Sequence, residues 1–388
     1  MESCLVLSDT HLSPDHGQAT GAALARLLTE TPCEEVILAG DIFDLSLERP
    51  GVSVTEMVTR ALHGHPEFQR ALADHLARGG HLTLVPGNHD APLINGEGEQ
   101  ALRRAIGSQG DNQVTISRWF ARRGPVHVEH GHLYDPDNSF AHPLADHDPR
   151  TEPLGTAMMR RFVSPNDAYF FAHAHRTTPA SGLRQAVEKW GFGAPLVIAR
   201  YFIAAFGMVG DAALHKGTRA DERAQGDARI DQRARELDLE PGLLRQLVAL
   251  TSDPTHESAA RTFLRLYFDR IFAACTLATG VGLVTAAGLG VVGPSAGLLA
   301  SAIGGGYLAQ SVLREKNRYG ASIVEDIGHA ASLVREATGA ELVVFGHTHV
   351  PVVSTGYVNL GSFGYGHPTR PYLVLDHQGR PSVQHAPR

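Results

Sequence analysis

The chain has few cysteines, no excess of basic residues, and no basic segment followed by an apolar run at its start. Its three cysteines among 388 residues, Cys4, Cys33 and Cys275, form no spaced pair, so neither a disulfide framework nor a zinc knuckle is expected. The formal net charge of −7 argues against a general nucleic-acid binder, which needs a basic surface. We therefore expect a cytoplasmic protein without a signal peptide and without a nucleic-acid partner.

Charged residues are missing altogether from one internal segment, Ile271 to Leu313. Gly293-Pro294-Ser295 divides this segment into two apolar arms, each about long enough for the ~30 Å hydrocarbon core of a bilayer. Basic residues flank both sides, with Arg265 and Arg270 before the segment and Arg314 after it. This pattern is typical of a hairpin whose two ends stay on the cytoplasmic face of a membrane.

Two interpretations of this hairpin, 271–313, remain open. Small residues four apart, such as Ala300 and Gly304, let membrane helices approach closely. A soluble, buried helical hairpin would also be rich in Ala, Gly and Ser, and these residues make transfer into lipid only marginally favourable. A second apolar stretch, Tyr201 to Gly210, has the composition of a segment in a membrane interface. We expect membrane association through 271–313 and keep a soluble cap as the alternative.

The two ends of the chain have the pattern of one α/β domain. From Met1 to about His142, apolar strands alternate with helical patterns, and Pro66 starts a helix predicted over 66–77. The alternation returns at about Ile323 and ends in short antiparallel strands. We predict a discontinuous domain of residues 1–142 and 321–388, with a mainly helical insertion, 143–320. Within the insertion, the densely charged stretch Lys216 to Glu236 predicts a solvated helix or loop.

Five short apolar runs in this domain are each followed directly by a polar cluster. The clusters are Asp9-Thr10-His11, Gly40 to Asp44, Gly87 to Asp90, His130-Gly131-His132 and Gly346 to His349. Because open α/β sheets bind ligands at the carboxyl edge of their strands, we expect these clusters to meet there. Asp, Asn and His without Cys form a ligand set for two divalent metal ions, and they favour Mn, Fe, Zn or Co over Ca.

The residue types indicate how each cluster contributes to such a site. Asp41 ends a strand, and its carboxylate can bridge two ions. Asp9 and His11 alternate around Thr10, so both point the same way from an extended chain, and His347 and His349 do the same. Further donors are the Asn88 oxygen and a nitrogen of His130 or His132. Gly40, Gly87 and Gly346 fit tight turns where a side chain would obstruct the ion or the substrate.

In this order, the five clusters resemble those of the calcineurin-like metallophosphoesterase superfamily, and the resemblance covers about half of the chain. It implies an α/β fold in which two packed sheets are flanked by helices (αββα). It also implies two divalent ions, most readily Mn, bound by one shared carboxylate and two ligand sets. The first set is Asp9, His11, Asp41 and His349, and the second is Asp41, Asn88, His130 and His347.

The resemblance also implies roles for the residues around these ligands. His89 would lie near the leaving oxygen, as a catalytic acid or a phosphate ligand. Asp44 and Asp90 would orient metal ligands or His89. The superfamily pattern favours His130 over His132 as the ligand. Asp135, Asp137 and Asn138 follow closely and either line the pocket or form an Asp-Pro turn.

Within the superfamily, the layout is most similar to that of the UDP-diacylglucosamine pyrophosphate hydrolases, which are peripheral membrane enzymes. The chain departs from them in having His89 where they have Arg and His132 where they have Asp, and its insertion is larger and more apolar. We therefore expect hydrolysis of a phosphodiester, phosphomonoester or pyrophosphate, with a lipid-linked substrate at a membrane as the leading case. The alternatives are a soluble phosphodiesterase or protein phosphatase with a helical cap, and a non-catalytic scaffold of the same fold.

Overall fold

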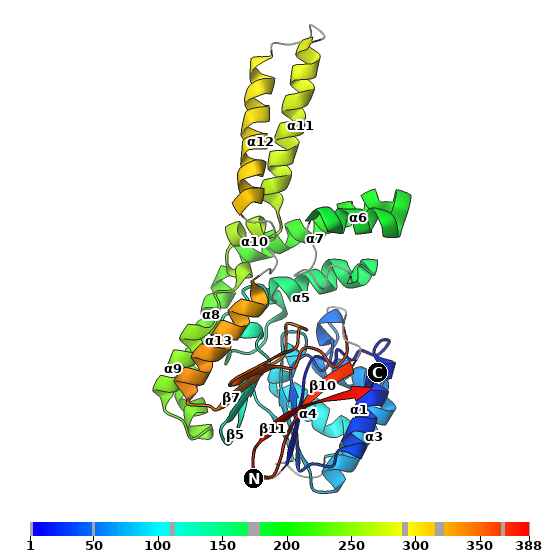
Figure 1. Ribbon diagram of the computed structural model, residues 1–388, viewed down its shortest axis with the longest axis vertical. Coiled ribbons are helices and arrows are strands. Elements are labelled where there is room, and N and C mark those ends of the chain that lie inside the picture. The colour runs from blue at the N-terminus through cyan, green and yellow to red at the C-terminus, as the bar shows by residue number, and fades with distance from the viewer. Residues whose placement is uncertain are drawn as a thin grey trace.

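The computed structural model describes residues 3–48, 51–108, 113–169, 179–288, 294–314, 322–365 and 369–387. Figure 1 shows a body of two sheets and flanking helices, a helical part next to it, and a two-helix hairpin that projects from the helical part.

Both sheets combine strands from the two ends of the chain. The six-stranded sheet has the order β11 (Pro381–Pro387), β10 (Thr369–Leu375), β1 (Cys4–Leu7), β2 (Glu35–Ala39), β3 (His81–Val85), β4 (Val114–Ile116). The five-stranded sheet has the order β5 (Phe120–Arg123), β6 (Val126–Glu129), β7 (Leu342–Phe345), β9 (Tyr357–Asn359), β8 (Val352–Ser354). Strands β1 to β4 are parallel to one another, and so are β6, β7 and β9.

The strand registers bring the polar clusters to one edge. Leu7 of β1 is level with Leu38 of β2, so the chain leaves both strands at the same height, just before the Asp9 and Asp41 clusters. In the other sheet, Val128 of β6 is level with Val344 of β7. The clusters that follow these two strands therefore also meet at the carboxyl edge.

Three apolar layers hold the body together. Buried residues of β1, β2, β6 and β7, such as Val6, Ile37, Val128 and Val344, pack between the two sheets. Burial of each such side chain contributes about 1.5–3 kcal/mol. The outer face of the six-stranded sheet is covered by α1 (Gln18–Glu30), α2 (Val54–His63), α3 (Pro66–Ala77) and α4 (Gly96–Ala105). The outer face of the other sheet is covered by α8 (Lys216–Glu236), α9 (Pro241–Leu250) and α13 (Ile323–Thr338). The predicted αββα architecture is confirmed.

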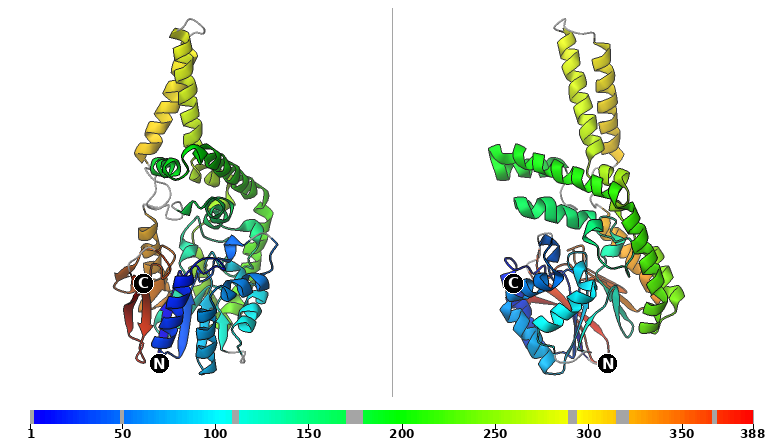
Figure 2. Two further views of the ribbon diagram at one scale, coloured as in Figure 1. Left: turned by 90° about the vertical axis from the view of Figure 1, so that its right-hand side faces the viewer. Right: turned by 180° about the vertical axis from the view of Figure 1, so that it is seen from behind.

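The remaining helices form the helical part and the hairpin. The helical part contains α5 (Leu154–Met158) with the π-helical turn that continues it (Met159–Val163), α6 (Pro179–Trp190), α7 (Ala194–Leu214) and α10 (Ala259–Arg265). The hairpin consists of α11 (Phe268–Gly288) and α12 (Ser295–Arg314). Figure 2 shows the hairpin projecting away from the body in both of its views. By length and composition, three helical segments could cross a membrane, namely Arg184–Leu214, Phe268–Gly288 and Ser295–Arg314.

Small residues set the distance between the two hairpin helices. A Cβ atom built on Gly280 would lie 2.5 Å from the backbone nitrogen of Ser301, and one on Gly304 would lie 2.6 Å from the carbonyl oxygen of Ala273. Any larger residue at these positions would force the helices apart, as expected for close helix packing. The outward side chains remain exposed, with Leu299 at 63% and Ile303 at 59% of their full accessibility. Among the described residues, therefore, these outer faces are exposed.

Candidate metal centre

The five clusters lie on loops with unusual backbone conformations. Asp9, His11 and Asp41 have φ values of 56°, 49° and 52°, and His347 and His349 have values of 67° and 55°. Side chains other than glycine rarely adopt this left-handed region, and such strain is often found at functional sites. The expectation that Asp9-x-His11 and His347-x-His349 are extended is therefore wrong. Both pairs still converge, because the turns fold their side chains toward the same edge.

The first group of possible ligands is Asp9, His11 and His349, whose ligating atoms all lie within 4.8 Å of one another. The Asp9 Oδ1 atom is 3.2 Å from His349 Nε2. The Nε2 atoms of His11 and His349 are 3.0 Å apart. Two imidazole nitrogens at this distance require a proton or a cation near them, and a metal ion would meet that need.

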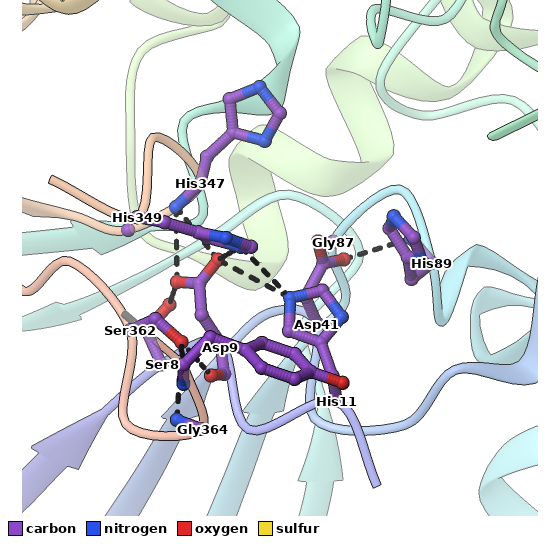
Figure 3. Close-up of polar contacts among 12 residues, drawn as sticks. Ser8, Asp9, His11, Asp41, Gly87, His89, His347, His349, Ser362 and Gly364 are labelled. Atoms are coloured by element: carbon purple, nitrogen blue, oxygen red, sulfur yellow. Dashed lines mark hydrogen bonds and ion pairs between the residues drawn. The ribbon is translucent and has the colours of Figure 1, made fainter. Parts of the chain in front are cut away.

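Asp41 takes part in two further groups that satisfy the same 4.8 Å criterion, one with His130 and His347 and one with His11 and His89. Its Oδ2 atom is 3.1 Å from His130 Nε2. Its Oδ1 atom accepts a hydrogen bond of 2.8 Å from the backbone N–H of His89. Figure 3 shows Asp41 between His11 and His89, with His347 and His349 on the side of Asp9. This position fits a carboxylate shared by two ions.

Three histidines of the ligand groups have a carboxylate or carbonyl partner on one ring nitrogen. His11 Nδ1 is 2.8 Å from Asp44 Oδ1, and His130 Nδ1 donates to the Ala39 carbonyl at 3.1 Å. His347 Nε2 is 2.9 Å from Asp135 Oδ2. Metal-binding histidines usually have such a carboxylate or carbonyl partner, which fixes the tautomer and the ring orientation.

Asn88 supplies a separate indication of a bound cation. Its Oδ1 atom is buried and has no hydrogen-bond partner among the described residues, while its Nδ2 group donates to Asn138 Oδ1 at 3.2 Å. A buried acceptor left unsatisfied costs about 1–3 kcal/mol. A divalent ion at this oxygen would remove that cost, so the donor set fits a metal centre.

Three glycines leave space that the site needs. A Cβ on Gly87 would lie 2.2 Å from Asp41 Oδ1, and one on Gly346 would lie 2.0 Å from Ser8 Oγ. Gly40 has a φ of +85°, and its Cβ would meet the His130 ring at 2.3 Å. Any side chain at these positions would displace a candidate ligand or its neighbour.

The carboxylates dominate the electrostatics of the site. Burial alone would lower the pKa of His11, but Asp44, Asp41 and Asp9 raise this pKa to about 10. Burial also opposes the charge on His130, but Asp41 and Asp9 raise its pKa to about 9. A proton and a metal ion thus compete for the same ring nitrogens. Metal binding should therefore release protons, and metal affinity should fall at low pH.

His89, Asp44 and Asp90 differ in what they contact. His89 Nδ1 is 2.8 Å from Asp44 Oδ1, so Asp44 holds both His89 and His11. Asp90 instead accepts backbone hydrogen bonds from Gly87 at 2.6 Å and Ile42 at 2.8 Å. Burial, followed by the charge of Asp41, raises the Asp90 pKa to about 6. Asp90 therefore ties two loops together and contacts their backbone.

The structure separates the two histidines of the fourth cluster. His130 lies in a ligand group with Asp41, whereas His132 is in none of the groups found among the described residues. The His132 ring lies 5.3 Å from that of His130. Burial and the neighbouring histidines His130 and His347 lower the pKa of His132 well below its usual value.

Several residues at the site escaped prediction. Ser8 Oγ donates to Asp9 Oδ2 and also lies 2.8 Å from the Ala39 carbonyl. Tyr365, 40% exposed, has its ring 5.3 Å from that of His11. The sequence leaves open whether Asp135 lines the pocket or forms a turn. In the structure, its carboxylate contacts His347 Nε2 and accepts a hydrogen bond from Asn138 Nδ2 at 2.7 Å. Only the position of Asp135, shortly after the His130 cluster, gave any signal in the sequence.

The sandwich thus places three groups of possible metal ligands at one polar edge. The family model described as calcineurin-like phosphoesterase matches residues 3–200, which is half of the chain, and the protein belongs to this family. The match begins at β1 and ends inside α7, so it includes the first four of the five clusters. A comparison with curated proteins gives no significant match.

Proposed function

We propose that the protein hydrolyses a phosphodiester, phosphomonoester or pyrophosphate bond with two divalent metal ions, and that its substrate is lipid-linked and held in a membrane. The observation that carries the metal-dependent reaction is the position of Asp41 within two groups of converging ligand atoms. Mn is the most favoured ion, with Fe, Zn and Co compatible with the same N and O donors.

In this proposal, two ligand sets hold the ions. Asp9, His11 and His349 form one close group, and Asp41, His130 and His347 form another, which supports one ion in each. The unsatisfied Asn88 oxygen supports Asn88 in the second set, and Asp41 is shared. When bound, such ions lower the pKa of water and neutralise the charge of phosphoryl oxygens.

The chain's own residues then orient the substrate and move a proton. His89 is fixed through Nδ1 by Asp44, which leaves its Nε2 atom to donate a proton to the leaving oxygen or to bind a phosphoryl oxygen. Asp44 also fixes His11, so it aligns the proton donor with a metal ligand. Asp90 holds the backbone of Asp41 and Gly87 in place.

The hairpin supports a location at the membrane. Its helices contain 21 and 20 residues, which corresponds to about 30 Å each and matches a bilayer core of ~30 Å. Among the described residues, side-chain hydrogen bonds between the two helices lie near the helical part, where Tyr307 donates to Asp269 at 2.6 Å and Arg270 donates to Ser311 at 2.9 Å. Both ends of the hairpin return to the helical part, which fits an anchor entered from the cytoplasmic face.

The reaction is tested with the purified full chain after removal of metal. We expect added Mn to restore hydrolysis of a chromogenic phosphodiester, and Asp41→Asn to abolish it because the shared charge is lost. The matched control is Asp326→Asn, an exposed residue of α13, which should retain full activity. Absence of activity with every divalent ion tried and a broad panel of phosphoesters would favour the non-catalytic scaffold.

The location is tested separately by cell fractionation. An anchored protein should stay with the membrane fraction after washing with high salt and alkaline carbonate, and detergent should release it. Recovery in the soluble fraction without detergent would favour the soluble phosphodiesterase or phosphatase with a helical cap.

A further inference from the structure

Helix α7 has an exposed apolar face beside the base of the hairpin. Leu196, Ile203 and Phe206 are 59%, 73% and 53% exposed. Their spacings of seven and three residues place them on one side of the helix. The opposite side, which includes Val197, is buried in the core of the helical part. Figure 1 shows α7 running crosswise to the hairpin, near the level where α11 begins.

Aromatic contacts fix α7 to the start of the hairpin. The Phe206 ring lies 4.4 Å from the ring of Phe268, the first residue of α11. The Tyr201 hydroxyl donates to the Leu266 carbonyl at 3.2 Å. Because these contacts join α7 to the residues where the hairpin enters, the apolar face of α7 has a set position relative to any bilayer around the hairpin.

A single cation interrupts the exposed face of α7. Arg200 is exposed and donates to Asn166 Oδ1 at 3.0 Å, and it has no carboxylate partner among the described residues. Arg200 and Asn166 line a pocket of about 410 Å³ together with Arg161 and the exposed Ile203. Arg161 is paired with Asp211 at 2.6 Å and with Glu152 at 3.5 Å. The unpaired charge beside apolar side chains is therefore that of Arg200.

We propose that α7 lies flat in the headgroup layer of the membrane that the hairpin enters, with Arg200 against the phosphate of an anionic lipid. In that position the exposed apolar side chains would meet the acyl boundary and the guanidinium would meet phosphate. Continuity with the hairpin favours a bilayer over a second copy of the chain. This inference rests on the hairpin anchor of the proposed function and adds a second contact.

The orientation has a consequence for the substrate. Asn88 Nδ2 lies 3.5 Å from Thr156 Oγ1 of α5, so the metal edge of the sandwich faces the helical part. With α7 in the headgroup layer, this edge faces the membrane surface. The substrate is then a lipid whose phosphoester lies in its headgroup and reaches the site without leaving the bilayer.

The test measures the depth of two labelled positions in the full chain, reconstituted in phosphatidylcholine vesicles with phosphatidylglycerol. A fluorescent label on the native Cys275, which is exposed on α11, reports the hairpin. Cys275 is seven residues beyond Phe268, about 10 Å along the helix. A label on Ile203→Cys, in a chain with Cys275→Ser and Cys33→Ser, reports α7. A label on Gln232→Cys of α8 in the same background is the control.

We expect spin-labelled lipids to quench the three labels differently. Quenching at position 203 should be severalfold stronger with a headgroup spin label than with one deep in the acyl chain, and Cys275 should show the reverse preference. Position 232 should not be quenched by either. Quenching at 203 no stronger than at 232 would overturn the proposal for α7, even when Cys275 is quenched. An unquenched Cys275 would instead contradict the hairpin anchor.

The contact of Arg200 is tested in the same vesicles. Phosphatidylglycerol should increase headgroup quenching at 203 relative to phosphatidylcholine alone, and Arg200→Gln should remove that increase. Inorganic phosphate added to phosphatidylcholine vesicles should not reproduce it, because the free ion does not bring the helix to lipid. An increase that persists in Arg200→Gln would overturn the headgroup contact. Loss of quenching at 203 as protein concentration rises would indicate a second copy as the occupant.

Discussion

The sandwich and the hairpin differ in whether their apolar side chains are buried or exposed. In the sandwich, apolar side chains of β1 and β7 such as Val6 and Val344 are fully buried between the sheets. In the hairpin, Leu299 and Ile303 face outward, away from the partner helix. Each buried Å² of apolar surface contributes about 25 cal/mol, so the sandwich obtains its stabilisation from protein contacts. In the proposed function, a bilayer covers the exposed apolar surface of the hairpin.

The two regions also differ in where they place polar groups. The sandwich buries carboxylates and imidazoles at one edge, including Asp9, Asp41 and His130, where oppositely charged groups contact one another. The hairpin has ionic side chains only at its base, where Asp269 and Arg270 bond to the second helix. This comparison is the basis of the proposal that the sandwich carries out the reaction and the hairpin determines where it happens.

A chain of polar contacts connects the two regions. Asp135 holds His347 and accepts from the backbone N–H of Asp137 at 2.9 Å. The Asp137 carboxylate accepts from Arg265 Nε at 2.6 Å and from the Thr255 hydroxyl at 2.7 Å. Arg265 ends α10, and α11 begins three residues later. The helical part thus supports the loop that orients one candidate metal ligand.

The largest effect is expected from charging the exposed face of the hairpin. The double change Leu299→Lys and Ile303→Lys places one cation in the second turn of α12 and one near its middle, where a charge would cost about 2.5–3.5 kcal/mol in a bilayer. We expect the protein to leave the membrane fraction, while hydrolysis of a water-soluble phosphodiester is unchanged. Immunoblots of washed membranes measure the first effect.

The control for this experiment is Val353→Lys, an equally exposed apolar residue on β8 of the sandwich. It should stay with membranes like the unaltered protein. The separation of the two regions would be refuted if the double variant lost its activity in solution, or if it remained bound to membranes.

A smaller effect is expected from Asp135→Asn. The change removes the charge that orients His347 but keeps the side-chain size, and loss of such an outer partner typically lowers metal affinity 10–100-fold. Calorimetric titration with Mn measures this loss without relying on activity. Asp253→Asn, an exposed residue of the helical part, is the control. Unchanged affinity in Asp135→Asn would show that His347 needs no such partner.

The smallest effect concerns the stability of the folded chain and involves Glu222 of α8. Burial raises the pKa of Glu222 from 4.5 to about 7, against a hydrogen bond from Thr151. Since the folded state binds this proton more tightly, the stabilisation is complete below pH 4.5 and is lost as the pH rises through about 7. Glu222→Gln should therefore increase stability by about 1–2 kcal/mol above pH 7.

Denaturant unfolding at pH 4.5 and pH 8 checks this expectation, with the exposed Glu336→Gln of α13 as the control. The variant and the unaltered protein should have similar stabilities at the lower pH. A gain of equal size at both pH values would show that the buried charge of Glu222 is not its cause.

The sequence predicts much of this architecture because the strand signals are local. Apolar runs ending in Asp, Asn or His mark β1, β2, β3, β6 and β7, and the helix predicted over 66–77 is α3 with the same bounds. The polar composition of the site follows from the same runs. The assignment of individual ligands and the domain boundaries remain predictions.

The predictions that differ from the structure concern segments whose conformation or burial depends on tertiary contacts and not on the local sequence pattern. The stretch Lys216 to Glu236, predicted to be a solvated helix or loop, forms helix α8 with most of its residues exposed or half-buried, but it also buries Ile230 and Ala234 in the core of the second sheet. Two apolar side chains among so many charges give no detectable period. The turns at Asp9 and His11 cannot be predicted from the local sequence either. The backbone N–H groups of Thr10 and His11 both donate to the Asp41 carbonyl, and these bonds fix the turns. Such long-range hydrogen bonds produce no recognisable sequence pattern in either segment alone.

The most direct test of the two-region account compares the presentation of substrate. A lipid phosphoester in vesicles and a water-soluble analogue of the same ester are offered to the Mn-loaded protein and to the variant with Leu299→Lys and Ile303→Lys. We predict equal rates for the two proteins on the soluble ester and a severalfold or greater loss for the variant on the vesicle ester. Equal rates on both substrates would contradict the account, because the hairpin would then have no part in reaching the substrate.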